Sequence, residues 1–234
     1  MRQIALIPAA GVGLRFGAGK PKQYVEIAGK TVLQHTLDVF LNHAAIDAVA
    51  VVLSPDDNVF QTGINQDKLQ VLRVGGETRA ESVRNGIRAL LEQGLAQDND
   101  NILVHDAARC CLSTQALDRL IDQAGRRPEG GILAVPVADT LKRADGGKQI
   151  EHTVSRAGLW QAQTPQLFRA GLLLQALSAE DLSAVTDEAS AVEALGIRPL
   201  LVEGESANLK LTLPQDEIIV RLLLESRKQN EMNG

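Results

Sequence analysis

Residues 4–23 read IALIPAAGVGLRFGAGKPKQ, a short apolar run followed directly by a loop rich in glycine and basic residues. An apolar run of this length predicts a strand, and glycines just after a strand let backbone N–H groups approach a phosphate closely. Arg15, Lys20 and Lys22 concentrate positive charge in the same loop. The stretch therefore predicts an α/β sheet whose first strand leads into a phosphate-binding loop.

The spacing of this loop fits neither of two better-known nucleotide-binding patterns. Gly11, Gly13 and Gly17 leave one residue too many for G-x-G-x-x-G, and Lys20 is followed by proline where a P-loop has Ser or Thr. The alternative is an ordinary glycine turn with solvated basic side chains. Because these cations gather in a protein of net charge -5, we favour phosphate binding.

The rest of the chain alternates β-rich runs with segments of helical spacing. The expected strands cover residues 4–7, 49–53, 69–74, 102–104 and 132–137, and the expected helices begin at Thr31, Thr78, Ser113, at Thr186 or Asp187, and near Pro214. Thr78 and Glu81 form a capping-box pattern, in which each side chain satisfies a backbone N–H. This alternation predicts a Rossmann-like α/β fold, with a mainly parallel twisted sheet flanked by helices, in one domain over residues 1–234.

One segment interrupts this alternation. Residues 140–143 and 150–154 read as two short polar strands around an Asp-Gly-Gly turn, which is a hairpin pattern. An isolated two-stranded hairpin is at best marginally stable in water. We therefore expect residues 138–158 to form an inserted, extended β-hairpin arm that lies on the parent domain or on a partner subunit.

The composition excludes several classes of protein. Hydrophobic residues make up 44% and charged residues 23% of the 234 residues, as in soluble globular domains. An aromatic share of 3% and a negative net charge argue against nucleic-acid binding. No apolar run approaches the roughly 20 residues that span a membrane, and we find no signal peptide. The two adjacent cysteines, Cys110 and Cys111, cannot link distant segments, so we expect a cytoplasmic protein.

Two further stretches carry chemistry. Gly75–Ser82 turns into a helix, where glycines would let a flat base lie against the backbone and Ser82 could bond a base edge; a plain capped loop is the alternative. Asp106 and Arg109 follow an apolar strand, the usual place for ligands in open α/β sheets. Asp106 could hold Mg2+ or a hydroxyl and Arg109 a phosphate, or the two could form a buried ion pair.

Seven blocks of the sequence together resemble one family. They are PAAGVGLRF with KPKQY at 8–24, GGETRAESV at 75–83, VHDAAR at 104–109, PVADTLKR at 136–143, GLWQAQTPQ at 158–166, TDEASAVE at 186–193 and NLKLT at 208–212. In this order they resemble the 2-C-methyl-D-erythritol 4-phosphate cytidylyltransferases of the non-mevalonate isoprenoid pathway, over almost the whole chain. The resemblance implies a nucleotidyltransferase fold and transfer of CMP from CTP to this sugar-alcohol phosphate, with release of pyrophosphate.

The resemblance also implies roles for particular residues. Arg15, Lys22, Arg156 and Lys210 would be catalytic. CTP would be bound by Ala9, Ala10, Gly11, Gly13, Gly76, Glu77, Ser82, Asp106 and Ala107. The sugar phosphate would be bound by Asp106, Arg109, Thr140, Arg156, Thr164, Thr186 and Lys210. The arm would cross a homodimer, so that part of each pocket comes from the neighbour.

The resemblance implies Mg2+, or another divalent cation, held mainly by the CTP phosphates, with no protein ligand identified. No general base is required, because a phosphate monoester has a second pKa near 6 and is largely dianionic at neutral pH. Two other functions stay open at this point. Ribitol 5-phosphate cytidylyltransferases share most of these motifs, and a non-catalytic nucleotide-binding module would need only the loop. We expect neither a nucleic-acid nor a membrane partner.

Overall fold

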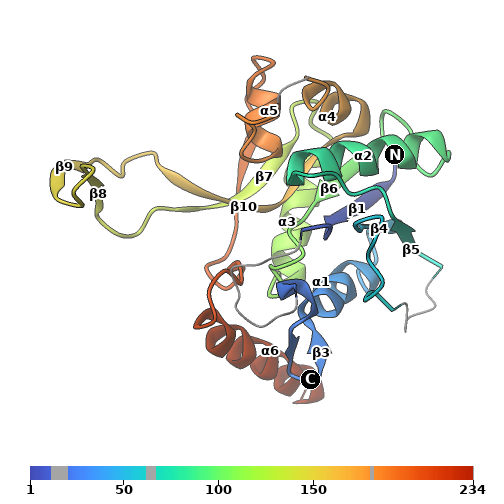
Figure 1. Cartoon of the computed structure of the whole chain (residues 1–234), viewed down its shortest axis with the longest axis horizontal. Helices are drawn as coiled ribbons and strands as arrows, with labels where there is room; N and C mark the ends of the chain where they lie inside the picture. The colour runs from blue at the N-terminus through green and yellow to red at the C-terminus, as the bar shows by residue number, and fades with distance from the viewer. Residues whose placement is uncertain (12–20, 62–66, 180–181, 234) are drawn as a thin grey trace.

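A computed structural model of the chain describes residues 1–11, 21–61, 67–179 and 182–233. Its centre is a seven-stranded sheet in the order β11-β7-β10-β6-β1-β4-β5 (Figure 1). These strands are β1 (Gln3–Pro8), β4 (Ala48–Val52), β5 (Leu69–Leu72), β6 (Asn101–Val104), β7 (Gly131–Pro136), β10 (Trp160–Arg169) and β11 (Leu200–Glu203). Only β10 pairs antiparallel with its neighbours in this sheet. The expected mainly parallel sheet is confirmed.

Helices cover both faces of the sheet (Figure 1). α2 (Arg79–Glu92), α4 (Ala170–Ala176) and α5 (Glu188–Glu193) lie on one face, and α1 (Val32–Leu41) and α3 (Thr114–Ala124) lie on the other. Successive residues of a strand point to opposite faces. Accordingly Ile4 and Leu6 pack under α2, whereas Ala5 and Ile7 pack under α1 and α3. This buried first strand fixes where Ala9, Ala10 and Gly11 begin the next segment.

A third, smaller cluster joins the C-terminal helix to the body. α6 (Asp216–Asn233) packs on β2 (Glu26–Ile27) next to β3 (Lys30–Thr31), with Val220 and Leu224 against Ile27. Cys110 and Cys111 are buried free thiols in the same cluster. Among the described helices, none combines the length and the apolar character needed to cross a membrane.

The helix starts lie where the capping residues indicated. Thr31, Thr78 and Asp187 each form a capping box with the residue three positions on, and Ser113 caps α3 through the Ala116 N–H. These side chains satisfy backbone N–H groups that a helix leaves unpaired at its start. The expected starts at Thr31, Thr78, Ser113 and Asp187 are therefore confirmed.

Two strands of the main sheet were missed by the sequence analysis, besides the two-residue strands β2 and β3. β10 contains Pro165, and proline argues against a central strand because it cannot donate to the ladder. The structure accommodates it with a shift of register against β7 between Ala162 and Gln166. β11 has four residues and starts just after Pro199, so its pattern is too short to indicate a strand.

The predicted hairpin arm is present. β8 (Leu141–Ala144) and β9 (Ile150–Val154) pair antiparallel in a two-stranded sheet of their own. Figure 1 shows this hairpin projecting away from the main sheet at the end of β7 and β10. Most of its side chains are exposed, including Ile150. The arm therefore presents its surface to solvent rather than to the core of its own chain.

Gly130, which precedes β7, provides a test of the packing under β10. Its φ is +67°, and a Cβ there would lie 2.3 Å from the Leu167 carbonyl oxygen. Gly94 has a nearly identical φ of +68° but open space around it. A side chain at such a φ costs roughly 1–2 kcal/mol. We expect Gly130→Ala to lower the free energy of unfolding by about 1–3 kcal/mol more than Gly94→Ala, in urea denaturation. Equal effects would contradict this packing.

Candidate active site

The candidate site lies at the carboxyl ends of the central parallel strands. β1 pairs with β4 on one side and with β6 on the other. After β1 the chain forms β4 and β5 on the first side and then crosses to β6 on the opposite side of β1. Ligands of open α/β sheets bind at such a switch point. A cavity of about 290 Å³ opens there. It is lined by Pro8, Ala9, Ala10, Gly11, Lys22, Gln23, Gly76, Glu77, Thr78, Arg79, Ser82, Asp106, Ala107, Ala108 and Lys210.

The loop after β1 packs closely on the turn that precedes α2. The Ala9 N–H donates to the Val52 carbonyl at 2.8 Å, which extends the sheet pairing by one residue. A Cβ on Gly75 would lie 2.3 Å from the Ala10 Cβ, so only glycine allows the two segments to meet. Gly75 is therefore required by packing, and the cavity is bordered by its neighbour Gly76.

Ser82 holds the shape of this turn. Its Oγ accepts a hydrogen bond from the Gly76 N–H at 3.1 Å and donates to the Thr78 carbonyl at 2.9 Å. The Ser82 side chain is buried, whereas Glu77 is exposed at the rim. The backbone of Gly76 and Glu77 thus borders the cavity in a fixed conformation.

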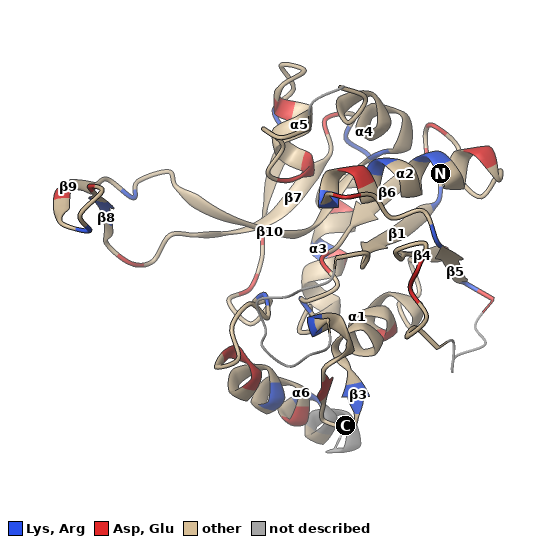
Figure 2. Cartoon of the chain, in the orientation of Figure 1, with Lys and Arg blue, Asp and Glu red and all other residues tan. Residues whose placement is uncertain are grey.

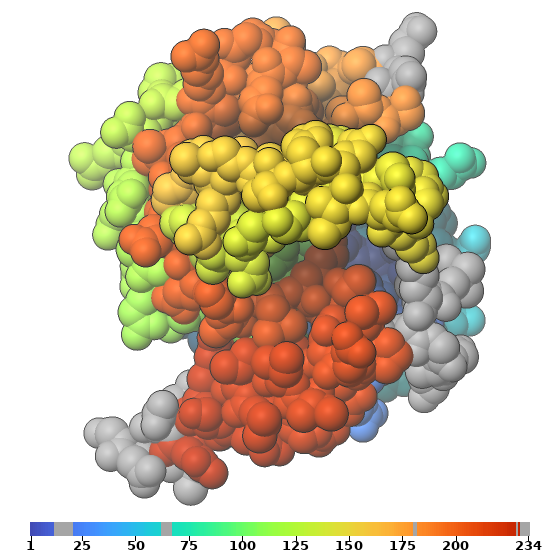
Figure 3. Space-filling view, turned by 90° about the vertical axis from the view of Figure 1, so that its left-hand side faces the viewer, coloured from blue at the N-terminus to red at the C-terminus, as the bar shows by residue number. Residues whose placement is uncertain are grey.

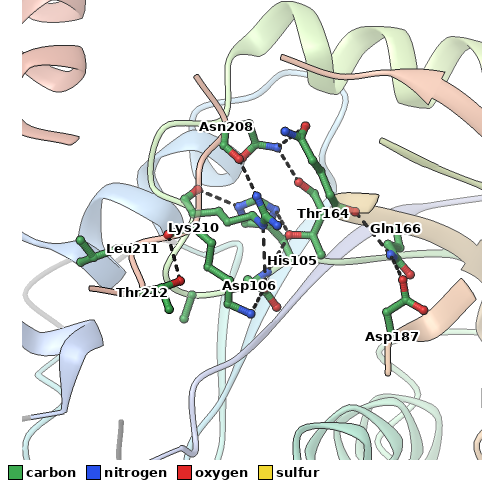
Figure 4. Close-up of polar contacts among 12 residues, drawn as sticks. His105, Asp106, Thr164, Gln166, Asp187, Asn208, Lys210, Leu211 and Thr212 are labelled. Atoms are coloured by element: carbon green, nitrogen blue, oxygen red, sulfur yellow. Dashed lines mark hydrogen bonds and ion pairs between the residues drawn. The ribbon is translucent and has the colours of Figure 1, made fainter. Parts of the chain in front are cut away.

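Asp106 is the electrostatic centre of the site. Lys210 Nζ lies 2.8 Å and Arg79 Nε 2.9 Å from its carboxylate oxygens, and Arg109 Nε lies 3.7 Å away (the Lys210 contact is seen in Figure 4). Burial would raise the pKa of Asp106, but the charges of Arg79 and Lys210 lower it well below its ordinary value. The side chain is an anion that holds three cations around the cavity.

Arg79 connects this centre to α5. Its guanidinium donates to both carboxylate oxygens of Glu188, at 2.5 and 3.0 Å, as well as to Asp106. Burial would lower the pKa of Arg79, but the two carboxylates raise it on balance. For the fully buried Glu188, loss of solvent raises the pKa although Arg79 opposes the shift. The sequence analysis gave Arg79 no role and chose Thr186 rather than Glu188 from the same block.

His105 and Thr164 hold the Asp106 backbone. His105 Nε2 lies 2.9 Å from the Arg109 carbonyl, which can only accept, so Nε2 carries the proton. Nδ1 therefore accepts from the Thr164 hydroxyl at 3.0 Å, and Thr164 Oγ1 accepts from the Asp106 N–H at 3.1 Å. Burial lowers the pKa of His105 to about 4, so the ring is neutral at pH 7. Thr164 acts on the site through the position of Asp106.

The segment carrying Lys210 is anchored on both sides. Asn208 Nδ2 donates to the Thr164 carbonyl at 2.8 Å (Figure 4). The backbone carbonyl of Asn208 accepts from the Arg109 guanidinium at 2.6 Å. The Leu211 N–H donates to the Ala108 carbonyl at 2.9 Å, and the Leu211 carbonyl accepts from Lys22 Nζ at 3.3 Å. These bonds bring Lys22 and Lys210 to the same side of the cavity.

The structure brings together most of the residues predicted for the site. Those bordering the cavity are Ala9, Ala10, Gly11, Lys22, Gly76, Glu77, Ser82, Asp106, Ala107 and Lys210, with Arg109 and Thr164 behind Asp106. Thr186 is exposed just before α5. Thr140 and Arg156 are exposed on the arm and do not line this cavity. Gly13, Arg15 and Lys20 lie outside the described residues.

The residues that line the cavity include two carboxylates, Glu77 and Asp106. Among the described residues, no group of three His, Cys, Asp or Glu side chains is placed to hold a metal. The carboxylate of Asp106 is already surrounded by cations. Mg2+ often uses one or two carboxylates together with substrate phosphates. A divalent cation at this site would therefore take most of its ligands from a bound nucleotide.

Known proteins match this chain over nearly its whole length. The IspD family, 2-C-methyl-D-erythritol 4-phosphate cytidylyltransferase, matches residues 3–226. A protein of that name from Neisseria gonorrhoeae is 66% identical over 226 residues, covering 95% of this chain and 97% of that protein. The crystal structure of a 4-diphosphocytidyl-2C-methyl-D-erythritol synthase superposes with a TM-score of 0.87 and 61% identity, covering 96% of this chain and 100% of that one. The Francisella tularensis IspD structure superposes with a TM-score of 0.80 and 35% identity, covering 95% and 100%.

The fold and the cationic cleft are those of a nucleotidyltransferase, an enzyme that transfers a nucleotidyl group onto an acceptor. Within that class, the chain belongs to the 2-C-methyl-D-erythritol 4-phosphate cytidylyltransferase family of isoprenoid precursor biosynthesis. The family resemblance carried by the seven sequence blocks is confirmed.

Glu188→Ala tests the buried ion pair. The substitution removes two hydrogen bonds from the partly exposed Arg79 guanidinium, which keeps Asp106 as its carboxylate partner. We expect the free energy of unfolding to fall by about 2–3 kcal/mol, because charge-assisted hydrogen bonds to the fully buried Glu188 carboxylate are lost. Urea denaturation at pH 7 measures the change.

The matched control is Glu217→Ala, which breaks an exposed pair with Arg221 at 2.8 Å in α6. We expect that loss to stay below about 1 kcal/mol, because exposed ion pairs are screened by water. Losses of similar size in the two variants would show that the Arg79–Glu188 pair stabilises the fold no more than an exposed ion pair does.

Proposed function

We propose that this cleft transfers CMP from CTP to 2-C-methyl-D-erythritol 4-phosphate, giving 4-diphosphocytidyl-2-C-methyl-D-erythritol and pyrophosphate. Family membership supports the reaction. The observation that supports the location is the convergence of Lys22, Lys210 and the Asp106 cluster on a cavity beside the loop after β1. CTP would enter on the side of Gly11 and Gly76, and the acceptor on the side of Lys210.

The reaction needs placement and charge more than proton transfer. A phosphate oxygen of the acceptor attacks the α-phosphorus of CTP, a new P–O bond forms, and the bond to pyrophosphate breaks. The acceptor phosphate is largely dianionic at neutral pH and needs no base. Two polyanions repel each other, so cations must hold them in line. Lys22 and Lys210 border the cavity with their positions set by Leu211 and Asp106, which supports this role.

The cytosine and ribose ends would meet backbone rather than long side chains. Gly76 and Glu77 offer a turn whose shape Ser82 fixes, and Ala107 borders the cavity beside Asp106. The divalent cation, Mg2+ in our expectation, would offset phosphate charge when it is bound with CTP. Arg15 and Gly13 are expected to add to the triphosphate side. We expect a cytoplasmic location, because both cysteines of the chain are free thiols.

We further propose that the acceptor site is completed by the arm of a second copy in a homodimer. Thr140 and Arg156, which the family resemblance assigns to the sugar phosphate, are exposed and flank the paired strands of the hairpin at the end opposite its turn. The arm carries both basic and acidic residues and projects from its own body (Figure 2). Seen end-on, it stands between α5 and α6 in front of a hollowed part of the surface (Figure 3). An arm that extends outward in this way suits delivery of Arg156 to a neighbouring chain.

Pyrophosphate release from CTP and Mg2+ tests the acceptor. We expect kcat/KM for 2-C-methyl-D-erythritol 4-phosphate to exceed that for ribitol 5-phosphate by at least about tenfold, because specificity is a difference in transition-state binding. A reaction without acceptor is the control. Preference for ribitol 5-phosphate would identify it as the acceptor instead. CTP binding without product from either acceptor would indicate a non-catalytic nucleotide-binding module.

Mixing two inactive variants tests the shared site. We expect Lys22→Ala and Arg156→Ala each to reduce turnover at fixed subsaturating substrate, Lys22→Ala by roughly 100- to 1,000-fold. In mixed dimers, one site combines an intact Lys22 with an intact Arg156 from the other chain. Coexpression should therefore restore activity to about a quarter of wild type.

Lys30→Ala is the control for loss of a lysine, since Lys30 pairs with Asp38 on the surface and should leave turnover unchanged. No gain of activity in the mixture would contradict a shared site. A mass of 25.1 kDa by light scattering, rather than twice that value, would contradict the dimer.

A further inference from the structure

Gln23 lies next to Lys22 but has no role in the reaction as described so far. It belongs to η2 (Lys22–Tyr24), a single 3-10 turn, and its side chain is 5% exposed. Its Nε2 donates to the Ala9 carbonyl at 3.0 Å and to the Gly11 carbonyl at 2.9 Å. Both amide hydrogens are thereby used on the loop that follows β1. Gln23 is thus bonded to two points of this loop from a separate element.

These bonds determine which way the loop presents its N–H groups. In a trans peptide the C=O and the next N–H point in opposite directions. Because the Ala9 carbonyl points to Gln23, the Ala10 N–H points away from Gln23. Within the described part of the chain, no hydrogen bond uses this N–H, and Ala10 borders the cavity. A backbone N–H held in one orientation at the border of a cavity is the kind of group that binds a phosphate.

The other two residues of η2 tie it to different parts of the site. Lys22 reaches the Leu211 carbonyl, next to Lys210. The Tyr24 hydroxyl donates at 2.6 Å to Asp57, which lies in the segment after β4. Lys22 and Gln23 are adjacent, so their bonds connect the Lys210 segment to the backbone after β1.

We propose that Gln23 is a positioning residue that locks the backbone donors after β1 to Lys22, so that they engage the CTP phosphates as one unit. The inference rests on the proposed function, because it takes this loop as the CTP site. Its effect is on the nucleotide rather than the acceptor, since its side-chain bonds within the described residues reach Ala9 and Gly11. A carbonyl released from Gln23 can rotate, and its partner N–H rotates with it.

Gln23→Met removes both donors while keeping a side chain of similar length. We expect CTP with Mg2+, titrated calorimetrically without acceptor, to bind roughly 10- to 100-fold more weakly, as two hydrogen bonds would give. The KM for the acceptor should change by less than about twofold. CTP binding equal to wild type would overturn the proposal, as would a KM change confined to the acceptor.

Tyr24→Phe is the matched control, because it removes one hydrogen bond from the same turn and keeps the ring packed. We expect it to bind CTP within about twofold of wild type, since its bond does not reach the loop. Equal weakening in both variants would mean that Gln23 acts only by holding η2 together, which overturns the proposal.

A measurement on the wild-type protein covers the case in which Gln23→Met does not fold. The side-chain amide protons of Gln23 should exchange with solvent more slowly by NMR than those of the exposed Gln97, and the Ala10 N–H should shift when CTP is added. Exchange as fast as that of Gln97 would overturn the proposal. Failure of the proposed function looks different, because the wild-type enzyme would then form no pyrophosphate.

Discussion

The site depends on one buried carboxylate. Asp106 lies where β6 ends, and Arg79, Arg109 and Lys210 converge on it from α2, from its own loop and from the segment before α6. Like charges at these distances would repel strongly in a poorly solvated cleft. The Asp106 anion makes their proximity possible, and Glu188 adds a second anion from α5. Segments that are distant in sequence are thereby held at one edge of the sheet.

Much of the fold could be predicted from local patterns, because the physics that produces them is local. Thr78 with Glu81, and Ser113 before an amphipathic run, mark helix starts within four residues. β10 could not be predicted in the same way. Its proline is tolerated only because the ladder against β7 shifts at that point, and this depends on a strand 25 or more residues earlier in the chain.

The candidate site likewise has features that local sequence patterns predict and features that depend on contacts between distant residues. The position of Asp106 at a strand end was visible in the sequence, as was the basic loop containing Lys22. The bond between Arg79 and Glu188 joins residues 109 positions apart, and no periodicity reports such a pair. The role of Gln23 could not be inferred from the sequence, because it depends on the Ala9 and Gly11 carbonyls that accept its hydrogen bonds. The identity of the substrates came from family resemblance and not from residue chemistry.

β10 has one further consequence. Its outer residues, beginning at Trp160, pair with β7 near the base of the arm, whereas Gln166 and Leu167 pair with both β6 and β7. Thr164, which holds Asp106, lies between these two parts, where the register shifts. Ten residues of strand extend over about 33 Å, so one continuous segment runs from the base of the arm to the residue that holds Asp106. A change in the length of β10 would therefore alter the spacing between the arm and the cleft.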